Sequence, residues 1–280
     1  MNDSFRCEEA LVVLGIEKAM MDFVSKLVDP YDRQARLYPA LIALAPAVVF
    51  FTCLYGSRLN LWTSLGSILM ACGVLYLISN LARNAGKRIE ERLFEQWGGK
   101  PTTQMLRHRN SAIDAITKQR YHAVLSKGIG KAFPTRAEED ADPSASDATY
   151  QAGIRWLIEA TRDPKLFGMI LKENIAYGFH RNMLGLRPVG SGIAALVIFG
   201  TLLDQGVVKT AAPVLSTEHL ATLSAPALLS ILVSIALLLI WLMAFGRETV
   251  RRFAFIYAER LLQACDRLGR PTRSTTKVKG

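Results

Sequence analysis

The segment at residues 173–188 holds the densest group of side chains that can bind a ligand. Arginine heads can reach lipid phosphates while aromatic rings lie at the membrane interface. The same side chains can instead form a specific site for a lipid, a nucleotide or a protein partner, in which a planar guanidinium makes paired hydrogen bonds. We expect the interfacial anchor and keep the specific site open. The residues concerned are Tyr177, His180, Arg181, Asn182 and Arg187.

A second group of residues, Trp97-Gly-Gly-Lys-Pro-Thr-Thr103, invites comparison with a phosphate-binding loop because glycines, Lys100 and Thr102 lie together. A phosphate-binding loop needs an earlier glycine and a preceding strand. Here the upstream pattern is helical, and Pro101 interrupts the run of backbone N–H groups. We therefore predict that the glycines end a helix, and we keep Lys100 as a candidate ligand-binding residue.

The other polar residues form no recognisable catalytic or metal-binding pattern. The four histidines (His108, His122, His180 and His219) have no partner at helical spacing. The acidic run at residues 138–142 lacks the spacing of an EF-hand and is typical of a solvated loop. The four cysteines are far apart and predict neither a disulfide framework nor a zinc site. We expect no catalytic residue, no metal and no cofactor, and we favour a non-enzymatic protein.

Four apolar blocks dominate the chain of 280 residues, of which 50% are hydrophobic. They are residues 37–55, 59–82, 189–208 and 225–245, and only the third contains a charged residue, Asp204. About 20 apolar residues suffice for a helix that crosses a bilayer. Each block is therefore predicted to span the membrane, although Asp204 leaves open whether the third crosses fully.

The distribution of positive charge predicts how these spans are threaded. Of the 34 lysines and arginines, all except Arg58 and Lys209 lie in the two termini or between the second and third spans. Positive residues concentrate on the cytoplasmic side of membranes. Both termini and residues 83–188 are therefore predicted to be cytoplasmic, with the spans in the cytoplasmic (inner) membrane. Because the net charge of +10 has this explanation, nucleic acid is not expected as a partner.

Helical periodicity predicts the remaining elements, and no alternating strand pattern occurs between residues 83 and 188. The second span should continue through Trp97 as one helix, and Thr135 with Glu138 fits a capping box. A helix that starts after Asp163 should end near Gly185. The other expected elements are an amphipathic helix at residues 4–28, helices at 118–126, 148–161 and 247–268, and a disordered tail at 270–280.

These elements together predict an all-α integral membrane protein with four transmembrane helices and a helical cytoplasmic domain between spans 2 and 3. The predicted segments are a cytoplasmic amphipathic helix (1–36), a transmembrane hairpin (37–82), the cytoplasmic α-helical domain (83–188), a second transmembrane hairpin (189–245), and a cytoplasmic amphipathic helix with a basic tail (246–280).

Three short stretches carry a resemblance to known proteins: Trp97-Gly-Gly-Lys-Pro-Thr-Thr103, the Thr161-Arg-Asp163 turn and the segment at residues 173–188. Together they resemble bacterial inner-membrane proteins of uncharacterised function over residues 90–190. The resemblance implies no activity and assigns no functional residue.

We expect a membrane protein whose cytoplasmic domain senses or docks a ligand or a cytoplasmic protein partner. Two alternatives stay open. One is an oligomeric pore-forming effector of the bacterial defence type, gated by the cytoplasmic domain; the other is a membrane-bound enzyme acting on a lipid or a nucleotide. Small residues four apart, such as Ser67 and Ala71, permit close helix contact in the membrane. Membrane lipids and further copies of the chain are the expected partners.

Overall fold

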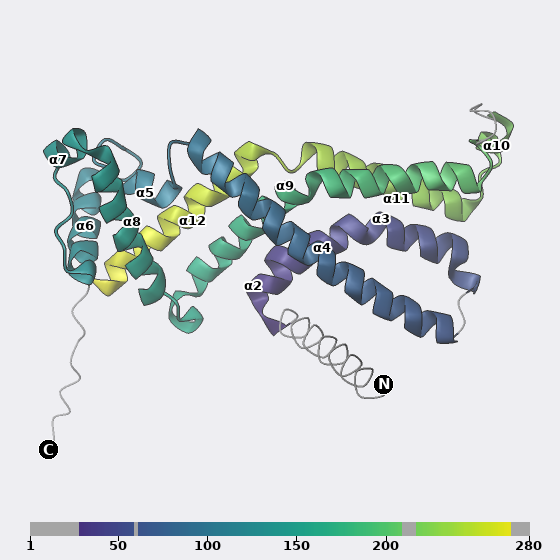
Figure 1. Ribbon diagram of the computed structural model, residues 1–280, viewed down its shortest axis with the longest axis horizontal. Coiled ribbons are helices and arrows are strands. Elements are labelled where there is room, and N and C mark those ends of the chain that lie inside the picture. The colour runs from purple at the N-terminus through teal and green to yellow at the C-terminus, as the bar shows by residue number, and fades with distance from the viewer. Residues whose placement is uncertain (1–27, 59–60, 209–216, 270–280) are drawn as a thin grey trace, which may run out of the picture. The chain divides into compact units, whose positions relative to one another are not determined.

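The computed structural model describes residues 28–58, 61–208 and 217–269, and every regular element in these ranges is a helix (Figure 1). Residues 1–27 and 270–280, on which the predicted N-terminal helix and the tail fall, lie outside the described residues. The elements are α2 (Pro30–Asp32), the π-helix η1 (Arg33–Leu37), α3 (Tyr38–Tyr55), the 3₁₀-helix η2 (Gly56–Arg58), α4 (Leu61–Gln96), α5 (Pro101–Leu106), α6 (Ala115–Ile129), α7 (Arg136–Ala141), α8 (Pro143–Ala160), α9 (Pro164–Asp204), α10 (Thr217–Ala221), α11 (Ala225–Met243) and α12 (Arg247–Leu268).

Three helical segments of the described chain are long and apolar enough to cross a membrane. They are Pro30–Tyr55 with 26 residues, α9 with 41 and α11 with 19. Large apolar side chains remain exposed on them, such as Leu196 on α9 and Leu232 on α11, as expected of surfaces that face lipid. The all-α prediction is confirmed for the described residues. The predicted span at residues 59–82 lies mostly in α4, and a fourth span stays a prediction.

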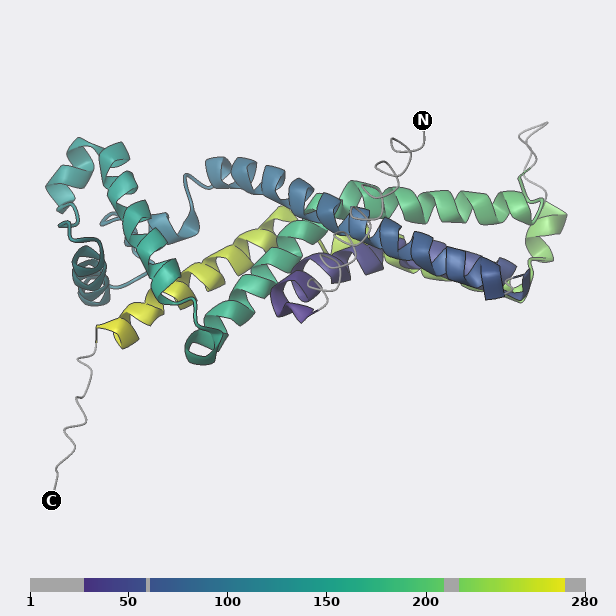
Figure 2. The ribbon, with the colours of Figure 1, turned by 60° about the horizontal axis from the view of Figure 1, so that its bottom comes forward.

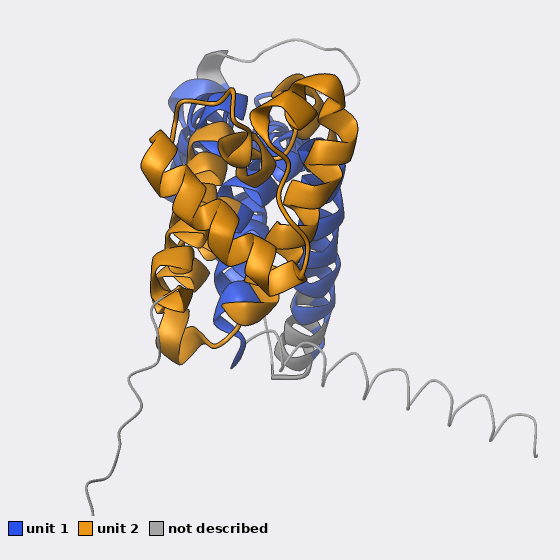
Figure 3. Cartoon of the chain, turned by 90° about the vertical axis from the view of Figure 1, so that its left-hand side faces the viewer, with its two compact units in different colours: residues 1–90, 178–250 blue, residues 91–177, 251–280 orange. Residues whose placement is uncertain are grey.

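The chain divides into two compact units (Figure 3). Unit 1 comprises residues 1–90 and 178–250, and unit 2 comprises residues 91–177 and 251–280. The chain passes between the units within α4, within α9 and within α12, so each passage lies inside a helix. Most of the predicted C-terminal cytoplasmic helix therefore belongs to unit 2.

In unit 1, the second half of α9 runs beside α11 (Figure 2), and α11 also packs against α3. Trp241 of α11 is fully buried in a cluster with Met183 and Leu186 of α9. A Cβ atom at Gly190 would lie 2.2 Å from Cε2 of Trp241, so only glycine fits beneath this ring. Such close packing is how membrane helices associate where the hydrophobic effect gives no preference for helix over lipid.

Unit 2 is a helical domain whose core draws on four helices. The five core side chains named at the end of this paragraph are at most 1% exposed, and burial of such a side chain contributes about 1.5–3 kcal/mol. Local signals fix the helix ends: Asp114 accepts a hydrogen bond from the N–H of Thr117 at 2.8 Å, and Thr135 and Glu138 form the predicted capping box. The core includes Leu106 of α5, Leu125 of α6, Tyr150 and Leu157 of α8, and Leu261 of α12.

The predicted helices α4 and α12 are confirmed, but the predicted end of α9 is wrong. Helix α4 is continuous over 36 residues and α12 has the predicted bounds. Helix α9 does not end near Gly185: it continues through Pro188 to Asp204, so the cytoplasmic helix and the third apolar block are one element. A Cβ atom at Gly185 would lie 2.6 Å from the backbone N of Gly86. This glycine therefore permits α9 to pack closely on α4 and does not terminate the helix.

Candidate functional site

The six predicted site residues are divided between the two units. Tyr177 and Lys100 belong to unit 2, whereas His180, Arg181, Asn182 and Arg187 belong to unit 1. Lys100 is exposed and directly precedes α5. The glycines before it adopt φ angles of 78° and 124° after the end of α4, as predicted for a helix stop.

Arg181 and Asn182 form a buried cluster that joins three segments of unit 1. Arg181 is 7% exposed, and its Nη1 donates to Oε1 of Glu90 on α4 at 2.9 Å. The fully buried Asn182 donates through Nδ2 to the carbonyl of Ala35 in η1 at 2.7 Å. A Cβ atom at Gly86 would lie 2.1 Å from Oδ1 and 3.2 Å from Cα of Asn182, so a larger residue there would displace the buried Asn182. The two side chains thus hold α9 to α4 and η1.

The other predicted residues on α9 make separate contacts. The ring of Tyr177 is parallel to that of Tyr257 in unit 2, with centroids 6.2 Å apart. In unit 1, Arg187 donates to the carbonyl of Leu242 at 2.9 Å. This carbonyl lies near the C-terminal end of α11, where the helix dipole stabilises a cation. His180 packs edge-on against Phe179. An interfacial anchor or a ligand site at these residues stays a prediction.

A cavity of about 520 Å³ lies in unit 2 where the loop between α5 and α6 meets the first turns of α6. Its volume falls within the range of about 300–1,000 Å³ found for small-molecule sites. No sequence pattern predicted it, because the loop that forms it has no motif. It is lined by His108, Arg109, Asn110, Ser111, Ile113, Asp114, Ala115, Lys118, Gln119 and His122.

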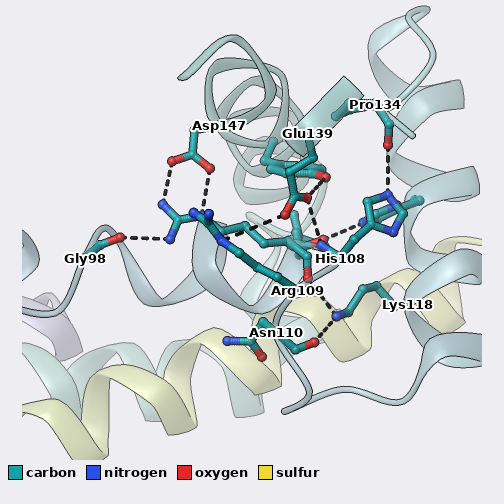
Figure 4. Close-up of polar contacts among 12 residues, drawn as sticks. Gly98, His108, Arg109, Asn110, Lys118, Pro134, Glu139 and Asp147 are labelled. Carbon is teal, nitrogen blue, oxygen red and sulfur yellow. Dashed lines mark hydrogen bonds and ion pairs between the residues drawn. The ribbon is translucent and has the colours of Figure 1, made fainter. Parts of the chain in front are cut away.

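Glu139 of α7 holds the α5–α6 loop through its carboxylate (Figure 4). Its side chain is 2% exposed, and its Oε2 accepts hydrogen bonds from the N–H of His108 at 2.8 Å and the hydroxyl of Tyr150 at 2.6 Å. Its Oε1 lies 4.0 Å from Nε of Arg109. The acidic run is therefore not a solvated loop at this position: the expectation is wrong for Glu139, whose carboxylate is one of the buried structural groups of unit 2.

Two cations complete the scaffold (Figure 4). Lys118 is 5% exposed, and its ammonium donates to the carbonyl of Arg107 at 2.8 Å and to the carbonyl of Asn110. Arg107 makes a two-pronged ion pair with Asp147 of α8, with Nε donating at 2.9 Å, and also donates to the carbonyl of Gly98. These hydrogen bonds tie the loop to α6, to α8 and to the residues that follow α4.

His108 and His122 meet at this cavity although 14 positions separate them in the sequence. Their rings stand edge-to-face with centroids 5.0 Å apart. Nε2 of His122 lies 2.8 Å from the carbonyl of Leu106, and Nε2 of His108 lies 2.9 Å from that of Pro134, so both nitrogens are assigned as donors. The sequence gives no signal for this pair, since helical spacing does not relate a loop residue to a helix residue. In the described ranges, no group of three histidine, cysteine or acidic side chains is arranged to hold a metal ion.

The environment of the cavity shifts several pKa values. Burial lowers the pKa of His122 from 6.5 to about 4 and also lowers the pKa of the Lys118 ammonium. Burial alone would raise the pKa of Glu139, but the hydrogen bonds from Tyr150 and from the backbone of His108 and Arg109 lower it overall. At neutral pH the imidazole of His122 in the cavity wall is thus neutral, and the carboxylate of Glu139 that holds the loop is ionised.

The lining brings together several side chains that can bind a ligand. It offers hydrogen-bond donors and a guanidinium beside a loop that buried hydrogen bonds hold, and small-molecule sites are usually preformed in this way. No protein-family model, curated protein or solved structure matches the chain. The function is therefore argued from the residues and their geometry.

Proposed function

We propose that the chain is an integral membrane protein whose helical unit 2 binds a small soluble ligand in the cavity beside the α5–α6 loop. The observation that carries the proposal is the cavity itself. It has the size of a ligand site, and Glu139, Lys118 and Arg107 hold its walls in place. A preformed site avoids much of the ordering cost of binding. The protein acts as a sensor in the inner membrane, with unit 2 on the cytoplasmic side, where positive charge concentrates.

The helices that pass between the units support a coupling of ligand binding to the membrane spans. Helix α4 is continuous across residue 90 and α9 across residue 177. In unit 1 the Arg181–Glu90 ion pair joins these two helices, and Asn182 joins them to η1 at the start of the first span. Contiguous rigid elements of this kind can carry a displacement from one site to another.

The binding proposal is tested on the full-length chain in detergent by thermal unfolding against a library of soluble metabolites. Ala115→Trp inserts an indole at an exposed position that lines the cavity and removes no polar group. Ala123→Trp places the same side chain at an exposed position of α6 outside the cavity and is the matched control. We expect a compound that raises the Tm of the wild type and of Ala123→Trp but not of Ala115→Trp.

Two results would contradict the proposal. In one, no compound stabilises the wild type. In the other, every stabilising compound acts equally on Ala115→Trp, which would place its site elsewhere.

A further inference from the structure

Arg109 differs from the other cations at the cavity because its guanidinium is left largely available. Its side chain is 53% exposed, whereas Lys118 and Arg107 are engaged by carbonyls and by Asp147. Within the described residues, its one recorded polar contact is the 4.0 Å separation between its Nε and Oε1 of Glu139, which is too long for a hydrogen bond. The contact involves the Nε side of the group, so the edge formed by the two Nη atoms is open to a ligand.

The rest of the lining adds side chains that can donate beside Arg109. Ser111 and Gln119 are exposed at the cavity, and no hydrogen bond of either side chain within the described chain competes with a ligand. Asn110 uses its Oδ1 to accept from the N–H of Ala112, which leaves its amide NH₂ group. Asp114 is the one acid in the lining, and its carboxylate caps α6 through the N–H of Thr117. The cavity therefore offers donors to a ligand rich in acceptor oxygens.

We propose that the ligand of this cavity carries a phosphate or carboxylate group whose oxygens accept hydrogen bonds from the Nη edge of Arg109. Arginine matches such oxyanions because its planar fork donates two parallel hydrogen bonds. The carboxylate of Glu139 lies on the Nε side of the guanidinium, and Lys118 and Arg107 interact favourably with its charge. A volume of about 520 Å³ accommodates an anionic metabolite with further groups that reach Ser111 and Gln119. This inference rests on the proposed function, since it names the ligand class of the same cavity.

Isothermal titration calorimetry on the full-length chain in detergent tests the inference, with pyrophosphate and citrate as anionic probes and trehalose as a neutral probe. Each titration is made at a fixed, near-physiological ionic strength so that unspecific attraction to a basic protein is screened. We expect the wild type to bind pyrophosphate or citrate but not trehalose, and the anion that binds identifies the oxyanion source. Arg109→Gln should weaken that binding at least about tenfold, as for loss of a charge-assisted pair of hydrogen bonds.

Two further variants separate recognition from folding and from net charge. Arg109→Lys keeps the charge next to Glu139 but loses the fork, so it should also weaken binding while its Tm stays near that of the wild type. Arg155→Gln removes an exposed charge of α8 outside the cavity and should bind as the wild type does.

The inference is overturned if neither anion binds, or if Arg109→Gln and Arg155→Gln bind the anion equally well. The failure of the inference is distinguishable from that of the proposed function. A neutral metabolite that is lost in Ala115→Trp but retained in Arg109→Gln would leave the cavity as a ligand site and remove only the anion.

Discussion

Acid should weaken unit 2 through His122, whose ring is enclosed by the core. The side chain is 8% exposed, and its ring lies 5.1 Å from that of Phe133 and 5.5 Å from that of Tyr150. Lys118, His108 and Glu139 are the titratable groups that act on it. In the folded protein its pKa is lowered from 6.5 to about 4, chiefly by burial. Between pH 6.5 and pH 4, His122 is therefore protonated in the unfolded chain but neutral in the folded chain.

The sign and size of the effect follow from linkage. The contribution of the neutral His122 to stability is fully present above pH 6.5, decreases as the pH falls towards 4, and changes no further below that value. The folded and unfolded pKa values of His122 differ by about 2.5, and a difference of one corresponds to about 1.36 kcal/mol, so the effect on the free energy of unfolding is about 3 kcal/mol. Native-state hydrogen exchange of the α6 amides in the full-length protein measures the opening free energy of this region, once corrected for intrinsic exchange rates.

The matched variant His122→Gln isolates this residue from the other groups that titrate in acid. Glutamine retains a donor for the carbonyl of Leu106 but does not ionise. We expect the opening free energy of the wild type to fall by about 3 kcal/mol more than that of the variant between pH 7 and pH 4. Parallel pH profiles for the two proteins would refute the assignment of a neutral, buried His122.

Three further predictions concern unit 1 and the topology. Gly86→Ala places a methyl group against Asn182 and should destabilise the protein by about 1–3 kcal/mol. Gly73→Ala is the control and should not destabilise it, because no atom lies within 4 Å of the new Cβ. Equal melting temperatures of the two variants in detergent would count against the close crossing of α4 and α9. Arg181→Met removes the ion pair with Glu90 and should lower the free energy of unfolding by about 2–4 kcal/mol, and adding Glu90→Gln should restore part of this loss. If the losses of the two single variants simply add in the double variant, the two residues are not coupled. A single cysteine at the exposed Lys131 should react with an impermeant maleimide only after cells are permeabilised, and labelling of intact cells would reverse the predicted threading.

Periodicity and local signals carried the prediction of the fold where one helix could be considered alone. Helical periodicity through Trp97 predicted a continuous α4, and Thr135 with Glu138 predicted the start of α7. The end of α9 was mispredicted because a glycine such as Gly185 is typical of a helix stop. In the structure Gly185 meets Gly86 of α4, a contact between residues 99 positions apart that no local pattern reports.

The cavity was not predictable for the same physical reason. Glu139 belongs to an acidic run that is usually solvated, and only the packing of α7 on the loop at residues 107–114 turns it into a buried anchor. His108 and His122 come from a loop and a helix, and the fold alone brings their rings together. Arg181 and Asn182 were recognised as unusual by type, but their partners Glu90 and Ala35 lie on other segments.

The central claim, that ligand binding in unit 2 reaches the membrane helices, is tested most directly by hydrogen–deuterium exchange of the full-length chain in lipid nanodiscs. Exchange is compared with and without the metabolite that stabilises the wild type most, and with Ala115→Trp as the control. We expect slower exchange in the loop at residues 107–114 together with altered exchange in α4 and α9 near Glu90 and Arg181, and neither change in Ala115→Trp. Protection of the loop with unchanged exchange in α4 and α9 would contradict the coupling, and unchanged exchange in the loop would contradict binding at the cavity.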